Sequence, residues 1–182
     1  PIKTAIIGAG YIADWHAQAL QSTSGAELVA VCDRSSSAAE AFAEAYGLVA
    51  YTDLDELLDA NVCDAVHILT PPSSHADLAV KCLEAGLHAF VEKPVALSFE
   101  ETKRITEAAE AEGKTFAAGH NFMGLPSYER IKAAANAGEY GKITSAEINW
   151  HFPLAPLRSG PFGLWLLKEP KNLLLELGPH LF

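Results

Sequence analysis

A short glycine-containing segment near the start constrains the fold of this chain more than any other feature. Residues 3–7, a run typical of a buried strand, are followed at once by Gly8-Ala9-Gly10-Tyr11-Ile12-Ala13, and residues 14–21 then follow a helical pattern. This spacing is the fingerprint of a dinucleotide-binding βαβ unit, with alanine at its third small position. The first glycine allows a tight turn, the second lets the backbone approach a pyrophosphate, and Ala13 allows close packing of helix and strand. We therefore expect this segment to bind the phosphates through Gly8, Gly10, Tyr11, Ile12 and Ala13.

An acidic residue indicates which dinucleotide the chain binds. Asp33 follows the apolar run 28–32, about 20 residues beyond Ala13, where this motif places a carboxylate. A carboxylate there can accept hydrogen bonds from both ribose hydroxyls of NAD, and it repels a 2′-phosphate. The next residue, Arg34, could hold a 2′-phosphate, stack on the adenine or remain solvated in its loop. NAD is therefore the expected cofactor, and NADP stays open.

Strands and helices are predicted to alternate along residues 1–120, as in βαβ units with a parallel sheet. Strands are expected at 3–7, 28–32, 48–51, 64–69, 87–91 and 114–118. Helices are expected at 14–21, at 36–46, at 53–59, from Ser73 or Ser74 to Glu84, and from Ser98, with Glu101 completing a capping box, to near Gly113. Six strands complete a doubly wound Rossmann sheet, so residues 1–120 are predicted to form a dinucleotide-binding domain.

The remaining residues, 121–182, show a different pattern. A helix is predicted over 126–137, and the alternating residues 143–152 predict a strand with one covered face, as is common in antiparallel sheets. The sequence stops in an apolar run, where Gly178-Pro179 is typical of a helix start. We therefore interpret 121–182 as the truncated beginning of a C-terminal substrate and oligomerisation domain, an α/β domain with a mainly antiparallel sheet, in an N-terminal piece of a longer protein.

Composition argues against several classes of partner. The net charge is −10 at pH 7 and the 13 Lys and Arg residues form no cluster, which disfavours nucleic acids and anionic membranes. Cys32, Cys63 and Cys82 form no CxxC pair, so we expect buried thiols and no metal site. The first strand leaves no room for a signal peptide, and no apolar run reaches membrane-spanning length, so a cytoplasmic protein is expected.

A lysine at the end of the fifth predicted strand is the strongest candidate for chemistry. Glu92-Lys93-Pro94 directly follows the apolar residues 87–91. In open α/β sheets ligands lie beyond the carboxyl ends of the strands, so Lys93 is expected to face the cofactor. The alternative is a surface lysine at a strand end.

With these motifs placed, the sequence resembles the glucose-fructose oxidoreductase, inositol dehydrogenase and rhizopine-catabolism (Gfo/Idh/MocA) family over its whole length. The matching stretches are 5–13, Thr70-Pro71-Pro72-Ser73-Ser74-His75 with Ala79, Val91 to Pro94, Gly138 to Ile143, and Glu176 to His180. The resemblance implies a Rossmann domain followed by a mainly antiparallel α/β domain. It also implies hydride transfer between NAD(P) and a hydroxyl or carbonyl group of a sugar, cyclitol or similar polyol.

The resemblance further implies roles for individual residues. Lys93 would bond the reacting hydroxyl and His180 would exchange its proton, a role favoured if the first turn of a helix keeps that histidine neutral. Glu176 stands where many relatives have an aspartate, so its role in orienting substrate or histidine is the least secure. The matching positions expected beside the cofactor are Thr70, Pro71, Pro72, His75 and Glu92. His75 could instead belong only to the first turn of its helix, and His180 could be a packing residue.

Two other functions remain open. The same fold serves in regulators that bind a dinucleotide without turnover, and in reductases of non-sugar substrates such as dihydrodiols. The joint presence of Lys93 and His180 favours the enzyme, because a sensor has no need for both. We expect the 182-residue chain to bind the dinucleotide without turnover, and the full-length protein to be a homo-oligomer acting on a small molecule.

Overall fold

The computed structural model describes residues 1–147, 149, 151 and 165–180. The chain forms two compact units, Pro1–Gly119 and His120–Phe182. The first unit is built on a sheet, and the elements of the second unit within the described residues are helical.

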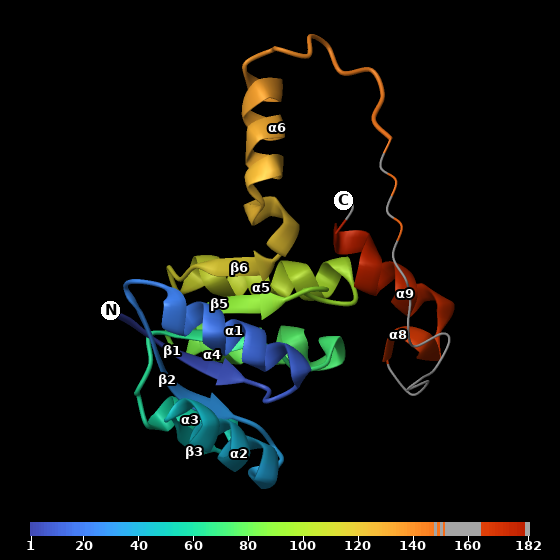
Figure 1. Cartoon of the computed structure of the whole chain (residues 1–182). Helices are drawn as coiled ribbons and strands as arrows, with labels where there is room; N and C mark the ends of the chain where they lie inside the picture. Colours follow the sequence, from blue (N-terminus) through green and yellow to red (C-terminus); the bar gives the residue numbers. More distant parts are fainter. Residues whose placement is uncertain (148, 150, 152–164, 181–182) are drawn as a thin grey trace. The chain divides into compact units, whose positions relative to one another are not determined.

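A six-stranded sheet forms the centre of the first unit (Figure 1). The strands are β1 (Ile2–Ile7), β2 (Ala26–Cys32), β3 (Val49–Tyr51), β4 (Ala65–Ile68), β5 (His88–Glu92) and β6 (Phe116–Gly119). All pairings are parallel, in the order β3-β2-β1-β4-β5-β6. This is the Rossmann order, and it confirms the parallel sheet expected from the sequence. The order reverses between β1 and β4, the point at which such sheets bind ligands beyond the strand ends.

Helices cover both faces of this sheet (Figure 1). They are α1 (Tyr11–Ser22), α2 (Ser36–Tyr46), α3 (Leu54–Asp59), α4 (His75–Glu84) and α5 (Phe99–Ala111). On the face covered by α1 and α2, Ile6 packs in a cluster with Phe42. On the other face Ile7 belongs to a second cluster with Leu83 and Ile105. Neighbouring residues of β1 thus serve opposite layers, because side chains alternate along a strand.

Local sequence signals fix several helix ends. Gly47 ends α2 with a φ of 71°, a left-handed conformation that glycine adopts readily. The Ser98 hydroxyl begins α5 by accepting a hydrogen bond from the N–H of Glu101 at 3.1 Å, as predicted. The Glu101 carboxylate accepts in turn from the N–H of Leu97 at 2.8 Å, one residue before the donor expected in a capping box.

The start of α4 differs from the prediction that Ser73 or Ser74 caps it. A 3-10 turn, η1 (Pro72–Ser74), precedes the helix. The Ser74 hydroxyl donates to the carbonyl of Pro71 at 2.9 Å, and no side chain of the described residues caps α4. Consecutive prolines restrict the backbone before the helix, so the chain enters α4 through a tight turn that uses the serine itself.

The second unit carries η2 (Asn121–Gly124), α6 (Pro126–Asn136), α8 (Trp165–Lys168), α9 (Pro170–Leu177) and η3 (Gly178–His180). The strand predicted over 143–152 is wrong for its described positions, 143–147, 149 and 151, which adopt no strand conformation. Its other positions lie outside the described residues. A strand is stabilised by backbone hydrogen bonds to a neighbour, and this unit offers no strand within its described part. The expected antiparallel sheet is therefore not seen there.

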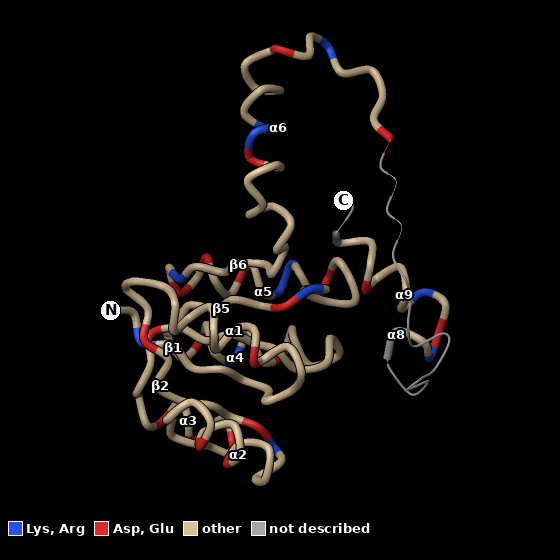
Figure 2. Tube along the Cα trace, viewed as in Figure 1, with Lys and Arg blue, Asp and Glu red and all other residues tan. Residues whose placement is uncertain are grey.

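Charged residues are distributed over many elements of the first unit (Figure 2). Lysines and arginines lie singly or in pairs along the trace, with acidic residues between them (Figure 2). Every helix in the described part of the chain is too short or too polar to cross a membrane.

Candidate functional site

The turn after β1 requires glycine at one position and leaves space at another. Gly8 has a φ of +99°, and a Cβ there would lie 3.0 Å from the carbonyl carbon of Leu69 and from Thr70. Glycine is therefore favoured both by conformation and by the close approach of the chain after β4. A Cβ on Gly10 would meet no described atom within 4 Å, so the space over this residue is open.

Helix α1 begins at this open glycine. Gly10 is the residue before the helix, and among the described residues no side chain accepts a hydrogen bond from the first turn. Backbone N–H groups at such a helix start attract anions, because they lack partners within the helix and carry its positive dipole end. An open glycine beside an uncapped helix start is the environment that a pyrophosphate requires, so these residues fit a dinucleotide.

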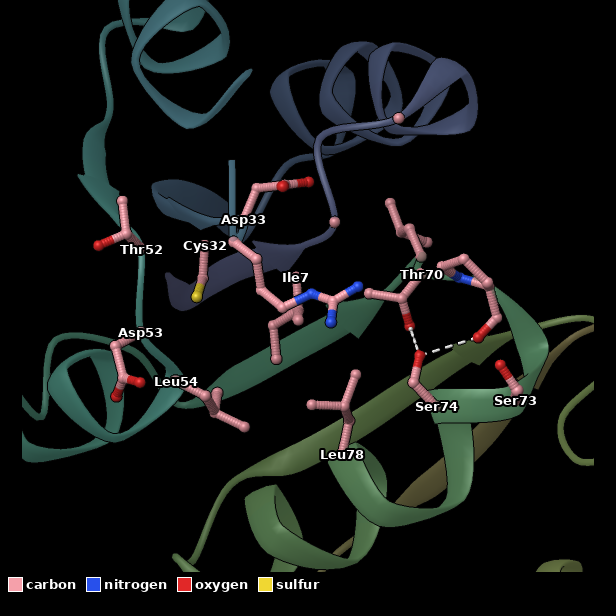
Figure 3. Close-up of a pocket in the computed structure, with 15 residues that line it drawn as sticks. Ile7, Cys32, Asp33, Thr52, Asp53, Leu54, Thr70, Ser73, Ser74 and Leu78 are labelled. Atoms are coloured by element: carbon pink, nitrogen blue, oxygen red, sulfur yellow. Dashed lines mark hydrogen bonds between the residues drawn. The ribbon is translucent and has the colours of Figure 1, made fainter. Parts of the chain in front are cut away.

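A cavity of about 530 Å³ lies at the carboxyl ends of the strands, beside this turn (Figure 3). Its walls come from the ends of β1 and β2 and from the loops after β3 and β4. Among its lining residues are Gly8, Gly10, Asp33, Arg34, Asp53, Thr70 and Ser74. The predicted cofactor residues Gly8, Gly10, Asp33, Arg34, Thr70 and Pro71 are thus brought to one cavity.

Asp33 connects the end of β2 to the glycine turn. One carboxylate oxygen accepts a hydrogen bond from the N–H of Ala9 at 2.8 Å, and the other accepts from the N–H of Ser35 at 2.8 Å. An ionised carboxylate offers about four acceptor positions, so two remain available for a ribose. Asp33 therefore shapes the turn as well as the cavity edge. The sequence pattern indicated the second role and not the first.

Hydroxyl groups of the loop after β4 form the opposite wall of the cavity (Figure 3). The Thr70 hydroxyl lies 2.8 Å from that of Ser74, and Ser74 donates onward to the carbonyl of Pro71 at 2.9 Å. Because Ser74 has a single hydrogen to donate, Thr70 donates to Ser74 in this arrangement. The short chain of bonds fixes the Thr70-Pro71-Pro72 loop beside the glycine turn.

Lys93 follows the last residue of β5 and is half-buried. The peptide bond to Pro94 is cis. The carbonyl of Pro94 lies 2.9 Å from Nδ1 of His75, whose Nε2 lies 2.6 Å from the carbonyl of Thr70. The His75 side chain is therefore engaged with two loops of the protein itself, and the residue is only 1% exposed.

A second histidine cluster adjoins Glu92, and the sequence interpretation missed it. Nδ1 of His16, on α1, lies 3.0 Å from Nδ1 of His67, on β4, and Nε2 of His16 lies 3.9 Å from a carboxylate oxygen of Glu92. The His67 ring stacks on Phe90 with 4.7 Å between ring centres. Burial, and secondarily His16, lower the pKa of His67 from 6.5 to about 4. The sequence carried no signal for the contact between the two histidines, because they lie 51 residues apart on separate elements.

The three cysteines are buried free thiols. Burial raises the pKa of Cys82 to about 12 and those of Cys32 and Cys63 to about 11, with neighbouring carboxylates adding to the effect at the latter two. These groups are protonated at neutral pH. Within the described residues, no group of three or more His, Cys, Asp or Glu side chains could hold a metal ion.

The two predicted site residues of the second unit lie at the end of α9. Glu176 is in the last turn of this helix, and His180 is in η3, which follows without interruption because Gly178 keeps helical angles of −54° and −45°. The predicted helix start at Gly178 is therefore wrong. His180 follows the carboxyl end of α9, so the argument that a helix start keeps it neutral does not apply. The carbonyl of Pro179 lies 3.1 Å from Nδ1 of His120.

The sheet order, the glycine turn and Asp33 place the chain in the class of Rossmann proteins that bind dinucleotides. Comparison with known families specifies the class further. The model of the Gfo/Idh/MocA oxidoreductase family, described by its NAD-binding Rossmann fold, matches residues 2–120. The chain belongs to this family, as its sequence motifs indicated, and carries its NAD-binding fold.

Among curated relatives, the chain is 37% identical over 143 residues to scyllo-inositol 2-dehydrogenase (NAD(+)) of Bacillus subtilis, covering 78% of the chain and 42% of that enzyme. It is 34% identical over 155 residues to inositol 2-dehydrogenase of Rhizobium meliloti, covering 85% of the chain and 47% of that enzyme. The chain thus spans less than half the length of these relatives.

Solved structures show the same similarity. Myo-inositol 2-dehydrogenase from Lactobacillus plantarum matches with a TM-score of 0.71 and 30% identity, covering 79% of this chain and 43% of that one. The WlbA dehydrogenase from Bordetella pertussis, solved in complex with NADH and UDP-GlcNAcA, matches with a TM-score of 0.73 and 29% identity, over 78% and 44% of the two chains.

Proposed function

We propose that this chain provides the NAD-binding part of an oxidoreductase that transfers hydride between the nicotinamide and a hydroxyl or carbonyl group of a sugar, cyclitol or similar polyol. The observation that carries the proposal is the uncapped start of α1 at Gly10, within a cavity edged by Asp33. A helix start of this kind holds the phosphates of a dinucleotide. When bound, NAD supplies the acceptor or donor of the hydride.

Different residues of the cavity are proposed to bind different parts of the cofactor. The backbone from Gly8 to Ala13 would hold the pyrophosphate, and the remaining acceptor positions of Asp33 would take the ribose hydroxyls. Asp53 also lines the cavity. Two carboxylates near the ribose would repel a 2′-phosphate, so NAD is favoured over NADP. Arg34 would lie against the adenosine and reduce this preference.

Lys93 is proposed to bond the reacting oxygen of the substrate. Its ammonium group would stabilise negative charge that grows on this oxygen as hydride leaves or arrives at the neighbouring carbon. His180 is proposed to exchange the hydroxyl proton, and Glu176 to orient the substrate or His180. These roles rest on the family motifs, together with the position of Lys93 directly after β5.

The relatives support the proposed substrate class. They include dehydrogenases of inositol, of glucose 6-phosphate and of D-apiose, and each of these compounds carries neighbouring hydroxyl groups. A substrate with several hydroxyl groups is therefore proposed for this protein.

The test combines cofactor binding with a substrate screen. Calorimetric titration with NADH and NADPH comes first, followed by a screen of inositols, aldoses and polyols with NAD and NADP, using the protein that contains this chain and following NADH absorbance. Binding of NADH and oxidation of at least one polyol are expected. Binding without turnover on any substrate would favour a dinucleotide sensor. Oxidation of only non-sugar alcohols would contradict the proposed substrate class and leave the dehydrogenase activity in place. A protein that binds neither dinucleotide would overturn the proposal.

A further inference from the structure

One buried histidine joins the two loops that flank the cofactor cavity. His75 begins α4 and is only 1% exposed. Its Nδ1 lies 2.9 Å from the carbonyl oxygen of Pro94, after β5, and its Nε2 lies 2.6 Å from the carbonyl oxygen of Thr70, after β4. The ring thus connects the ends of two neighbouring strands.

Both partners of the ring can only accept hydrogen bonds. A carbonyl oxygen has lone pairs and no proton, so each ring nitrogen must donate if both contacts are hydrogen bonds. Neutral imidazole carries one N–H, whereas the imidazolium carries two. A neutral ring would place a nitrogen lone pair against an oxygen lone pair at 2.9 Å or less.

One of the two carbonyls belongs to the cavity wall and the other to the turn that carries Lys93. Thr70 lines the cavity and packs so closely on Gly8 that a Cβ there would lie 3.0 Å from it. Pro94 is buried and directly follows Lys93. A single ring therefore sets the spacing between one wall of the cavity and the turn that carries the lysine.

We propose that His75 is a positioning residue that bridges Thr70 and Pro94 through two ring N–H groups, and so aligns the cavity wall with the Lys93 turn. This role differs from the direct cofactor contact that the family motif suggested, because the ring is covered by protein. The alignment of Lys93 for chemistry rests on the proposed function, whereas the bridge itself does not.

The first test measures ring protonation in the unmodified protein. Nitrogen NMR of the histidine-labelled chain, with the His75 signals assigned by their loss in His75→Gln, is expected to show protons on both ring nitrogens and slow exchange with water. A single protonated nitrogen would overturn the bridge. The measurement is made on the unmodified protein without a bound cofactor, and the folded His75→Gln variant serves only to assign the signals.

The second test separates the two hydrogen bonds. In His75→Asn the side-chain amide nitrogen falls near the position of Nδ1, so the Pro94 bond is kept and the Thr70 bond is lost. In His75→Gln the longer side chain reaches the position of Nε2, so the Thr70 bond is kept and the Pro94 bond is lost. His75→Phe fills the space and removes both bonds.

NADH titration and amide NMR then report on each loop. His75→Asn is expected to weaken NADH binding about tenfold, the scale of leaving one buried acceptor unpaired, and to shift the amide signal of Thr70. His75→Gln is expected to keep NADH affinity within about twofold of the unmodified value while shifting the amide signal of Lys93. His88→Gln is the control, since His88 accepts one backbone hydrogen bond, from Thr115, at the opposite end of β5.

Equal loss of NADH affinity in His75→Asn and His75→Gln would contradict the proposal, as would unchanged affinity in His75→Phe. If the unmodified protein bound no NADH, the proposed function would fail. The bridge would then still be decided by the ring protonation and by the separate shifts of Thr70 and Lys93.

Discussion

The carboxylate of Asp33 accepts a hydrogen bond from the N–H of Ala9 at 2.8 Å, which fixes the end of β2 to the turn after β1. The residue proposed to set the ribose preference therefore also supports the backbone proposed to bind the phosphates. A change at Asp33 is expected to affect both ends of the cofactor site.

Asp33→Ala should lower the affinity for NAD and reduce the difference between the affinities for NAD and NADP. The variant loses two charge-assisted backbone hydrogen bonds as well as the acceptors for the ribose, so it should also lower the free energy of unfolding by about 2 kcal/mol. Calorimetric titration and urea unfolding measure the two effects. Asp55→Ala, an exposed change on α3, is the control. Equal affinity of the unmodified protein for NAD and NADP would contradict the assignment.

The two glycines of the turn should respond differently to alanine. Gly8→Ala places a Cβ 3.0 Å from Leu69 and Thr70 at a φ of +99°, so the free energy of unfolding should fall by about 2 kcal/mol or more. The methyl group added by Gly10→Ala would lie within 4 Å of no described atom, so the free energy of unfolding should be nearly unchanged. The same methyl group would occupy the space proposed for the pyrophosphate, so NADH binding should weaken. Thermal unfolding and NADH titration separate the pair. Normal NADH binding by Gly10→Ala would remove this residue from the phosphate site.

Folding stability should depend on pH through His67. Its pKa falls from 6.5 to about 4 on folding, so between these values the unfolded chain binds more protons than the native one. The stabilising contribution is fully present above pH 6.5 and is lost as the pH falls toward 4. At about 1.4 kcal/mol for each pKa unit, the loss is at most about 3 to 4 kcal/mol.

Urea unfolding at several pH values measures this loss. His67→Phe keeps a ring that can stack on Phe90 but cannot titrate, so its stability should vary less between pH 7 and pH 5 than that of the unmodified protein. His151→Gln changes an exposed histidine and serves as the control. Parallel pH curves for His67→Phe and the unmodified protein would rule out His67 as the cause.

Lys93→Met should mainly affect turnover. If Lys93 stabilises charge on the reacting oxygen, its removal should lower kcat by roughly a hundredfold or more and leave NAD affinity nearly unchanged. Lys103→Met, which changes an exposed lysine of α5, is the matched control. Steady-state kinetics with a substrate from the polyol screen, together with NAD titration, give both quantities. A near-normal turnover number would exclude Lys93 from the mechanism.

The sequence predicted the sheet and much of the cavity because these features depend on local signals. Apolar runs, capping residues and the Gly8 fingerprint act within a few residues of chain, and the helix over Ser36–Tyr46 matches its prediction fully. The strand prediction failed at the described positions 143–147, 149 and 151, because alternation shows which face is covered and cannot supply a pairing partner. The prediction of a new helix start at Gly178 was wrong for a related reason, since Gly178 keeps helical angles and the chain continues from α9 into η3.

The histidine contacts could not be predicted in the same way. His16 and His67 are 51 residues apart, and His75 and Pro94 are 19 apart, so neither pair has a local signature. Residue type alone left His75 as either a cofactor contact or a helix residue. The distinction required the positions of two carbonyl oxygens from separate loops.

The start of α1 also has a consequence for the lifetime of the protein. A helix whose first turn finds no side-chain acceptor among the described residues should fray at that end before it opens elsewhere. A phosphate bound there would act as the missing cap, and a ligand present at 100 times its Kd adds about 2.7 kcal/mol to folding. Resistance to heat and proteases should therefore follow the supply of dinucleotide, so that the amount of this protein in a cell is linked to the cofactor it binds.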